Sequence, residues 1–390
     1  MESIVRLSKI TPILLFISYI FTVRGGSNFG PYIYILDICL GLICLSCVIL
    51  DRHCKPVSLW GIIAMLALFT ITLLLSPAEV LGWKYEGIGV ISIYKEYMKY
   101  VLFFLFFFIG YVLELKQIAT DKYWVFIGMG FFLVSCVCFG IYLSVITEKF
   151  GINYQNNTAY LLVSVIPFIP LFFRYFKRKL IPITILVVLS VLIINASKRG
   201  AIICLFCSLL LMVFFYLKES SGNVKKIVVV FVLSIMSVFL IYYLISTNDY
   251  LMTRLMRMEE GNYGARSVAY PTMWKNWIYS SNVEYFFGGG LCHSVSVWGN
   301  FAHNDWLEIL CSNGLLGVSI YAFIFISITI CIYQWDADAM LKQSAYLCLM
   351  IWFLKTIFSM GYSDTNNCML MMLLGCYIAN SLDNNCCLDE

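Results

Sequence analysis

Long, unbroken runs of apolar residues alternate with short polar segments along almost the whole chain of 390 residues. A helix of about 20 such residues crosses the hydrocarbon core of a bilayer, which is roughly 30 Å thick. Backbone polar groups in lipid must be satisfied within the spanning structure, so each run is either a helix or a barrel strand. The runs are continuous rather than alternating, which excludes barrel strands and predicts helices.

The runs predict about twelve membrane-spanning helices. They are expected near residues 10–23, 31–50, 57–76, 93–113, 123–147, 158–173, 180–196, 201–217, 227–246, 304–333, 343–362 and 367–382. We therefore predict an all-α polytopic membrane protein that forms a single integral membrane domain over residues 1–390. The first run follows Arg6 and Lys9 but precedes no small-x-small cleavage site, so it is expected to stay as a helix.

Lysine and arginine residues gather in every second loop, which gives the predicted helices a direction. These loops carry Arg52 and Lys55, Lys116 and Lys122, the segment 174–179, Lys218, Lys225, Lys226 and Lys342. The positive-inside rule places them, and both termini, in the cytoplasm. The one long polar loop, residues 247–303, then lies on the outer side, and a loop of that length is usually functional.

The composition agrees with this class of protein and excludes others. The chain is 61% hydrophobic and 12% charged, whereas soluble domains contain roughly 25% charged residues. Its net charge of +4 is the usual excess of basic residues in cytoplasmic loops, so no nucleic acid partner is expected. The 16 cysteines lie mostly in apolar runs without metal-ligand spacing, which indicates packing residues rather than a disulfide framework or a metal site.

A histidine stands where the long loop meets the next predicted helix. His303 is followed, at intervals of eleven and fourteen residues, by Gly314 and Gly317. If the helix includes His303, the three residues share one face, and a neighbouring helix can approach the glycines closely. A helix N-terminus favours the neutral imidazole that a general base requires, whereas Asp305 and Glu308 favour the protonated form, which leaves the pKa open. The alternative is an interfacial histidine that caps the helix.

Two cations occupy a tight turn on the predicted outer side. Lys198 and Arg199 lie between the predicted helices 180–196 and 201–217, against the positive-inside bias. Guanidinium groups match phosphate oxygens, so the turn is a candidate anion site. The alternative is a pair of side chains that extend to the membrane surface.

The long loop adds three arginines. Arg254 and Arg257 can share a helix face, but Glu259 and Glu260 are close enough to neutralise them. Arg266 has no acidic neighbour in the sequence and is the better candidate to bind an anion.

Aromatic residues and glycines complete the loop. The aromatic residues form either an interfacial belt or a groove that stacks on sugar rings; they are Tyr263, Tyr270, Trp274, Trp277, Tyr279, Trp298 and Trp306. Gly288, Gly289 and Gly290 form a turn that permits close backbone approach, without the sequence context of a phosphate-binding loop.

Other charged residues are weaker candidates for a functional role. Asp336 and Asp338 resemble a metal-binding D-x-D pattern but lie in a predicted cytoplasmic loop, where solvation is the simpler interpretation. Asp37, Lys355 and Asp364 fall within or at the end of predicted helices. Such charges either pair with each other or line a functional cavity.

Several of these features together resemble the O-antigen polymerase and O-antigen ligase superfamily of bacterial envelopes. The family's histidine motif, His-Asn, nine residues, Gly, two residues, Gly, is matched without a gap. The matching pieces are Ser197-Lys198-Arg199-Gly200, Gly264-Ala265-Arg266, Gly288-Gly289-Gly290, and His303-Asn304 with Gly314 and Gly317. They cover residues 195–320, and the first half of the chain is similar to the family only in its pattern of spans.

The resemblance implies a lipid-carrier-type (GT-C-like) glycosyltransferase in the bacterial inner membrane, active on the periplasmic face without a metal or cofactor. Its substrates would be oligosaccharides linked to undecaprenyl diphosphate. A polymerase joins such repeat units, and a ligase transfers the glycan to lipid A–core. The chain length and compact loop look more like a polymerase. The implied partners, besides membrane lipid, are a chain-length regulator and other envelope glycan assembly proteins.

Carried over to this sequence, the resemblance implies that Arg199 and Arg266 hold the diphosphate and that His303 activates the acceptor hydroxyl. The support residues would be Lys198, Arg254, Arg257, Asn304, Tyr263 and Tyr270. The chemistry is reasonable, because guanidinium groups stabilise the charge that grows on a leaving diphosphate, and a direct attack inverts the anomeric centre. Two alternatives remain: a lipid-linked sugar flippase or transporter, for which internal repeats are expected, and a structural membrane protein.

Overall fold

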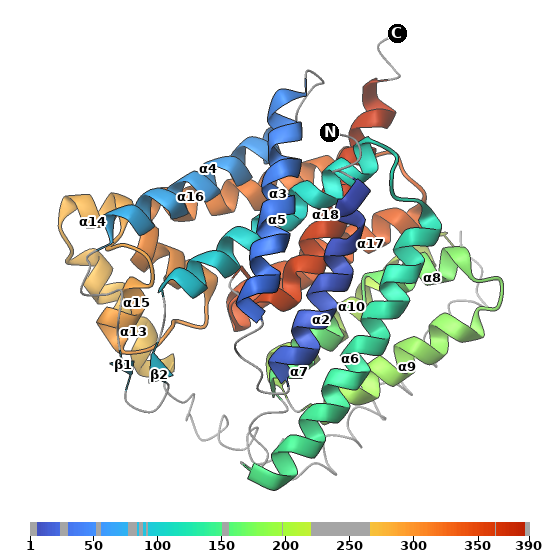
Figure 1. The fold of residues 1–390 in the computed structure, drawn as a ribbon, viewed down its shortest axis with the longest axis horizontal. Helices are drawn as coiled ribbons and strands as arrows, with labels where there is room; N and C mark the ends of the chain where they lie inside the picture. The colour runs from blue at the N-terminus through green and yellow to red at the C-terminus, as the bar shows by residue number, and fades with distance from the viewer. Residues whose placement is uncertain are drawn as a thin grey trace.

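The computed structural model describes residues 6–23, 30–51, 56–76, 84–85, 89–90, 93–149, 156–196, 198–219, 266–362 and 364–386 (Figure 1). These segments are almost entirely helical, which confirms the all-α class. The elements are η1 (Ser8–Ile10), α2 (Thr11–Val23), α3 (Gly30–Leu50), α4 (Val57–Leu75), β1 (Lys84–Tyr85), β2 (Gly89–Val90), α5 (Ile93–Leu115), α6 (Asp121–Lys149), α7 (Asn156–Val163), α8 (Phe168–Tyr175), α9 (Leu180–Asn195), α10 (Arg199–Glu219), α13 (Arg266–Ile278), α14 (Asn282–Phe287), α15 (His293–Trp298), α16 (Asp305–Gln334), α17 (Ala339–Phe358), η4 (Thr365–Asn367) and α18 (Cys368–Cys386). The two short strands pair antiparallel.

Six helical stretches in the described part of the chain are long and apolar enough to cross a membrane. They are Val57–Leu74, Ile93–Leu115, Asp121–Ile141, Thr158–Tyr175, Arg199–Lys218 and Asp305–Gln334. The fold is therefore that of a polytopic membrane protein, and the total of twelve spans stays a prediction. The predicted span 227–246 lies outside the described residues, as do Ser197, Arg254, Arg257, Tyr263, Gly264 and Ala265.

The centre of the bundle is the pair α5 and α18, which pack along each other (Figure 1). Aromatic and aliphatic residues of α5 from Tyr100 to Leu113 are buried on every side. Two glycines let the backbones touch: a Cβ on Gly110 would lie 1.8 Å from the carbonyl oxygen of Met372, and one on Gly375 would lie 2.0 Å from that of Phe107. Small residues at a crossing permit this close packing of apolar helices.

One predicted span is interrupted. The run 158–173 forms two short helices, α7 and α8, joined by a turn over residues 164–167. Pro167 ends the turn and immediately precedes α8, where its missing N–H does not break a helical hydrogen bond. The hydrophobic pattern predicts the burial of this segment but not its division.

The second half of the predicted outer loop is a folded helical segment rather than an irregular loop. Residues 266–303, called the cap segment below, contain α13, α14 and α15, which gather at one end of α4 and α16 (Figure 1). Ala269, Met273, Ala302 and Cys311 form a small core of their own between the cap segment and α16.

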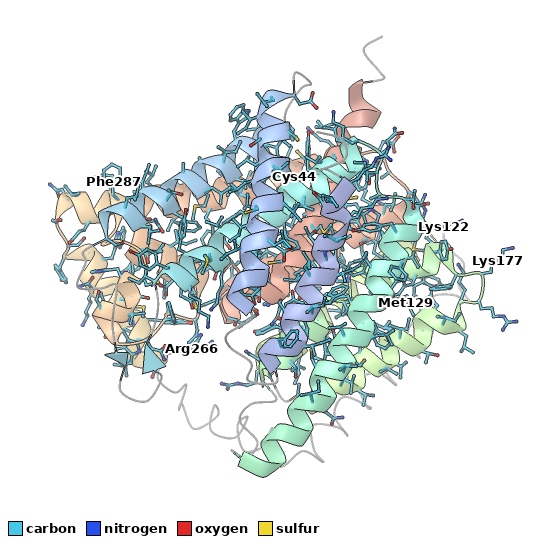
Figure 2. The ribbon with its side chains drawn as sticks, in the orientation of Figure 1. Cys44, Lys122, Met129, Lys177, Arg266 and Phe287 are labelled. Atoms are coloured by element: carbon cyan, nitrogen blue, oxygen red, sulfur yellow. The ribbon has the colours of Figure 1, made fainter. Side chains whose placement is uncertain are left out.

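The helices define two ends of the bundle. At the histidine end, α10, α13 and α16 begin and α17 ends; at the opposite end, α5, α8 and α16 end and α6 and α17 begin. Figure 2 shows Arg266 at the first end and Lys122 and Lys177 at the other. Helix α2 begins and helix α18 ends at the opposite end, as expected if both termini lie on one side (Figure 1).

Candidate active site

The glycine turn of the cap segment joins α16 where that helix is broken. Gly314 has φ 61° and ψ −160°, a conformation open essentially to glycine alone, and it divides α16 into two helices. The break frees backbone carbonyls, and the N–H groups of Gly289 and Gly290 donate to the carbonyls of Cys311 (2.9 Å) and Ser312 (3.2 Å). A buried backbone group requires such a partner, so the Gly288–Gly290 turn and the Gly314 break form one joint.

The predicted shared face of His303, Gly314 and Gly317 is therefore wrong. His303 precedes α16, and the break at Gly314 ends the helical register between them. A Cβ on Gly314 would meet the backbone of Phe286 and Gly288, so the close contact is with the cap segment. Gly317 makes room for Asn313 and Ile309 of its own helix rather than for a neighbouring one.

Two buried carboxylates hold the backbone on either side of His303. Asp305 accepts hydrogen bonds from the Tyr321 hydroxyl (2.7 Å) and the Gly361 N–H (2.7 Å). Glu308 accepts from the Ser294 hydroxyl (2.5 Å) and the Ala302 N–H (2.9 Å). A buried carboxylate is tolerated only when it is hydrogen-bonded in this way. Both acids thus face away from solvent and position the loop that carries the histidine.

His303 itself is exposed and has a left-handed backbone, with φ 51°. Partial removal from water, followed by the charges of Arg266 and Lys198, lowers the pKa of His303 from 6.5 to about 4. The imidazole is therefore neutral at pH 7 and can accept a proton. This resolves the direction of the pKa shift, because the acids nearest in sequence are turned away and the cations come from distant parts of the chain.

Two lysines flank a buried tyrosine near this histidine. The Lys198 ammonium lies 4.5 Å from the ring centroid of Tyr160, and the Lys355 ammonium lies 4.4 Å from the same centroid. Lys355 also donates to Asp364 at 2.8 Å. Burial raises the pKa of Asp364, but the charge and hydrogen bond of Lys355, the Asn366 N–H and the charge of Lys198 together lower it by more, so the net shift is downward. The aromatic face stabilises cations that would otherwise repel each other.

Arg266 and the turn before α10 meet at the end of α17. The Arg266 guanidinium donates to the carbonyl of Phe358 at 3.1 Å. A Cβ on Gly200 would lie 2.2 Å from the Tyr160 hydroxyl and 2.9 Å from the Cβ of Phe358. Glycine is thus required beside Arg199, the first residue of α10. The two predicted arginine segments therefore converge on Phe358, and Arg266 and Lys198 both act on His303.

Tyr270 and Asn304 link the cations to the histidine loop. The Tyr270 hydroxyl is hydrogen-bonded to Arg266 and Asn304; burial raises its pKa, and the Arg266 charge opposes that shift. Asn304 also caps α16, because its side chain accepts from the Leu307 N–H at 3.1 Å and donates to the Ile357 carbonyl at 3.2 Å. Asn304 therefore fixes the helix start, and with it the loop that presents His303.

The aromatic candidates of the cap segment and of the first turn of α16 include packed and exposed rings. Trp277 stacks on Tyr285 with a centroid distance of 4.4 Å, and Trp306 packs on Tyr321 at 5.3 Å, so both contribute to packing. Trp274 and Tyr279 are exposed. These exposed rings, together with the exposed Phe286 and Phe287, are placed for an interfacial belt or for contact with a sugar.

The remaining charged candidates are separate from this cluster. Asp338 caps α17 at the opposite end by accepting from the Met340 N–H. Asp37 is fully buried in α3, and neither of its oxygens has a hydrogen-bond partner among the described residues. The described part of the chain contains no group of three or more His, Cys, Asp or Glu placed to hold a metal, and every cysteine whose side chain is described is a free thiol.

Tyr160 is the member of the site that sequence reasoning missed. It is one aromatic residue in an apolar run, and nothing in its local sequence distinguishes it. Its position follows from the turn that divides α7 from α8 and from the absence of a side chain at Gly200.

A comparison with known proteins identifies a related family over the region that contains these residues. Residues 184–322 match the O-antigen ligase family. No curated protein matches the chain. The matched stretch contains the Lys198–Arg199 turn, Arg266 and His303, and it confirms that the chain resembles the O-antigen polymerase and O-antigen ligase superfamily, whose members are glycosyltransferase-like enzymes.

Proposed function

We propose that this protein is an O-antigen polymerase, which joins oligosaccharide repeat units linked to undecaprenyl diphosphate on the periplasmic face of the inner membrane. The observation that carries the proposal is a neutral, accessible imidazole next to two cations from separate parts of the chain, one at the start of α13 and one just before α10. His303 provides a proton acceptor, while Arg266 and Lys198 provide positive charge beside it. A transfer of a sugar from a diphosphate to a hydroxyl needs both groups at one place.

In the proposed reaction, the imidazole of His303 takes the proton of an acceptor sugar hydroxyl. The hydroxyl oxygen then bonds to the anomeric carbon of the donor as the bond from that carbon to the diphosphate breaks. The electron pair of the broken bond leaves on the diphosphate, which Arg266, Arg199 and Lys198 receive. A single displacement of this kind inverts the anomeric centre and consumes no cofactor.

Other residues would support this reaction. Tyr270 and Asn304 would hold the Arg266 guanidinium and the histidine loop in place, as their hydrogen bonds suggest. The third cation, Lys355, is paired with Asp364, so it would add less positive charge than Arg266. Arg254, Arg257 and Tyr263 keep their predicted supporting roles, and a chain-length regulator is a proposed partner.

A ligase that transfers the finished glycan to lipid A–core is the second candidate, because the matched family is described as an O-antigen ligase. The two functions separate on a lipopolysaccharide gel of a deletion strain. Core carrying one repeat unit identifies a polymerase. Bare core, with polymer retained on the lipid carrier, identifies a ligase. A normal ladder would contradict both.

The proposed orientation, with twelve spans, cytoplasmic termini and a periplasmic cap segment, has its own test. Tyr279→Cys places a thiol at a residue that is 84% exposed on the cap segment, and Lys177→Cys places one on an exposed basic loop. A membrane-impermeant maleimide should label Tyr279→Cys in intact spheroplasts and Lys177→Cys only after permeabilisation. The reverse pattern, relative to the unsubstituted protein, would place the site on the wrong side.

A further inference from the structure

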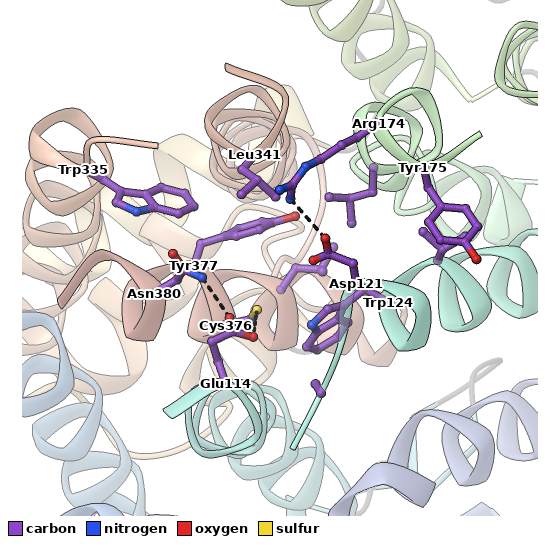
Figure 3. Close-up of a pocket in the computed structure, with 14 residues that line it drawn as sticks. Glu114, Asp121, Trp124, Arg174, Tyr175, Trp335, Leu341, Cys376, Tyr377 and Asn380 are labelled. Atoms are coloured by element: carbon purple, nitrogen blue, oxygen red, sulfur yellow. Dashed lines mark hydrogen bonds and ion pairs between the residues drawn. The ribbon is translucent and has the colours of Figure 1, made fainter. Parts of the chain in front are cut away.

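A second polar site lies at the end of the bundle opposite His303. A cavity of about 470 Å³ opens between the ends of α5, α6, α8, α16, α17 and α18 (Figure 3). This volume falls within the range of roughly 300–1,000 Å³ that is typical of ligand sites. The proposed glycosyl transfer uses none of the residues that line it, which include Glu114, Trp124, Arg174 and Trp335.

Two buried hydrogen-bond donors in the cavity wall lack acceptors. Trp124 and Trp335 are 5% and 1% exposed, and their indole N–H groups have no hydrogen-bond partner in the part of the chain described. Leaving a buried donor unpaired costs about 1–3 kcal/mol. In Figure 3 the pyrrole edge of Trp124 is turned toward the side of the cavity formed by Glu114 and Cys376. A ligand with acceptor oxygens would satisfy these donors.

Arg174 supplies a positive charge that is only weakly paired with Asp121. Its Nη1 lies 3.5 Å from Asp121 Oδ2, and the Asp121 side chain is 71% exposed. A strong charge-assisted hydrogen bond has a length of about 2.7–2.9 Å, so this exposed pair is loose. A guanidinium carries five N–H donors, which leaves several to bind an anion in the cavity.

Glu114 supplies the acceptors on the facing wall. Its carboxylate accepts from Asn380 Nδ2 at 2.8 Å and from the Cys376 thiol at 3.1 Å (Figure 3). An ionised carboxylate has about four lone-pair positions, so two remain for hydroxyl donors. A bare phosphate would be repelled by this carboxylate. A phosphodiester with hydroxyl groups a few atoms away would be attracted by both walls.

The surroundings of the cavity point to a lipid as the source of such a group. The adjoining loops are basic and contain Lys116, Lys122, Lys177, Arg178, Lys179 and Lys342. Basic pockets between membrane helices on the cytoplasmic side attract anionic lipid headgroups. We infer that this cavity binds the headgroup of an anionic glycerophospholipid, of which phosphatidylglycerol is the simplest, with its phosphodiester on Arg174 and the two indoles and its hydroxyls on Glu114.

The test measures lipid binding to the full chain and is independent of glycosyl transfer. The purified, delipidated protein is titrated by calorimetry with dioctanoyl-phosphatidylglycerol, and in parallel with dioctanoyl-phosphatidylethanolamine and with inorganic phosphate. The variants are Arg174→Gln and Trp335→Phe, the second of which replaces the indole with a smaller aromatic ring that has no N–H. Lys177→Gln is the matched control, because it removes a charge from the same basic region without touching the cavity.

We expect phosphatidylglycerol to bind more tightly than the other two probes. Arg174→Gln should raise the dissociation constant about tenfold and Trp335→Phe about fivefold, as losses of one charged and one neutral hydrogen bond predict. Lys177→Gln should change it less than about twofold, the size expected of an exposed charge. The inference is overturned if phosphatidylglycerol does not bind, if phosphate or phosphatidylethanolamine binds equally well, or if Lys177→Gln weakens binding as much as Arg174→Gln.

Discussion

The two ends of the bundle hold charge in different ways. At the opposite end, cations meet acids in exposed pairs, such as Lys116 with Asp51 at 3.1 Å and Arg174 with Asp121 at 3.5 Å. At the histidine end, Lys198 and Arg266 lower the pKa of His303, and Asp305 and Glu308 are turned inward to hold backbone. Lys355 is also paired at the histidine end, with Asp364 at 2.8 Å, so what distinguishes this end is that Lys198 and Arg266 act on an imidazole, as expected of a site that receives an anion.

Removing the imidazole is expected to have the largest effect on glycosyl transfer and so tests this difference between the two ends most strongly. His303→Ala should lower glycosyl transfer by about 10²- to 10⁴-fold, the usual contribution of a general base, with thermal unfolding of the detergent-solubilised protein unchanged. The measurement is the ladder of a complemented deletion strain together with the membrane abundance of the protein. His293→Ala is the control, because this second histidine bonds Ser296 within the cap segment. A normal ladder from His303→Ala would exclude the proposed role.

Removing the charge of Arg266, which acts on His303, should have the next largest effect on transfer. Arg266→Gln keeps an N–H donor on a shorter side chain and loses the charge. We expect transfer to fall about 10²- to 10³-fold, as when one preplaced donor to a developing anion is lost. Lys275→Gln removes a charge from the last turn of the same helix and should leave transfer unchanged. Equal effects from both variants would show that only the net charge of α13 matters.

The joint between the cap segment and α16 can be tested through stability. Gly314→Ala forces a side chain into a glycine-only conformation and against the backbone of Phe286 and Gly288, so the free energy of unfolding should fall by about 2–4 kcal/mol. In Gly140→Ala the new Cβ meets nothing within 4 Å, and the higher helix propensity of alanine should leave stability unchanged or raise it by up to about 1 kcal/mol. Thermal unfolding in detergent measures the stability of both variants. Equal losses of stability would contradict the proposed joint between the cap segment and α16.

The smallest expected effect is a shift in pH dependence. A base is lost when it is protonated, so kcat/KM should fall only as the pH drops through the His303 pKa of about 4, rather than through 6.5. Lys198→Gln removes a charge that lowers this pKa, so the acid limb of the profile should move to higher pH. Lys275→Gln should leave it in place. An acid limb near 6.5 in the unsubstituted enzyme would mean that neither burial nor the cations lower the pKa of His303.

Much of the fold could be predicted because membrane helices carry a strong, local signal. The predicted helix at 57–76 is α4, Val57–Leu75, and the one at 93–113 is α5, Ile93–Leu115. The helices of the cap segment were not predicted, because α14 and α15 are only six residues long and owe their stability to packing on α16. The break at Gly314 was also missed, since a glycine in an apolar run is equally compatible with a straight helix.

The candidate site shows the same division between local and distant information. His303 and Arg266 could be found because a loop histidine and an arginine without an acidic neighbour are visible in the sequence. The direction of the His303 pKa shift could not be predicted from the sequence. Asp305 is only two residues from His303, yet its carboxylate accepts hydrogen bonds from Gly361 and Tyr321 rather than from the imidazole. Tyr160 and Lys355 enter the site only through the packing of α7 against α10 and η4.

The joint at Gly314 also determines what can move. The amides of Gly289 and Gly290 end on carbonyls of α16, so the cap segment cannot lift away without leaving both partners unpaired in an apolar setting. If the proposed transfer takes place at His303, the glycan would enter and leave past this wall of the cap segment, and the geometry of that wall, rather than the opening of a lid, would select which acceptor sugars reach the imidazole.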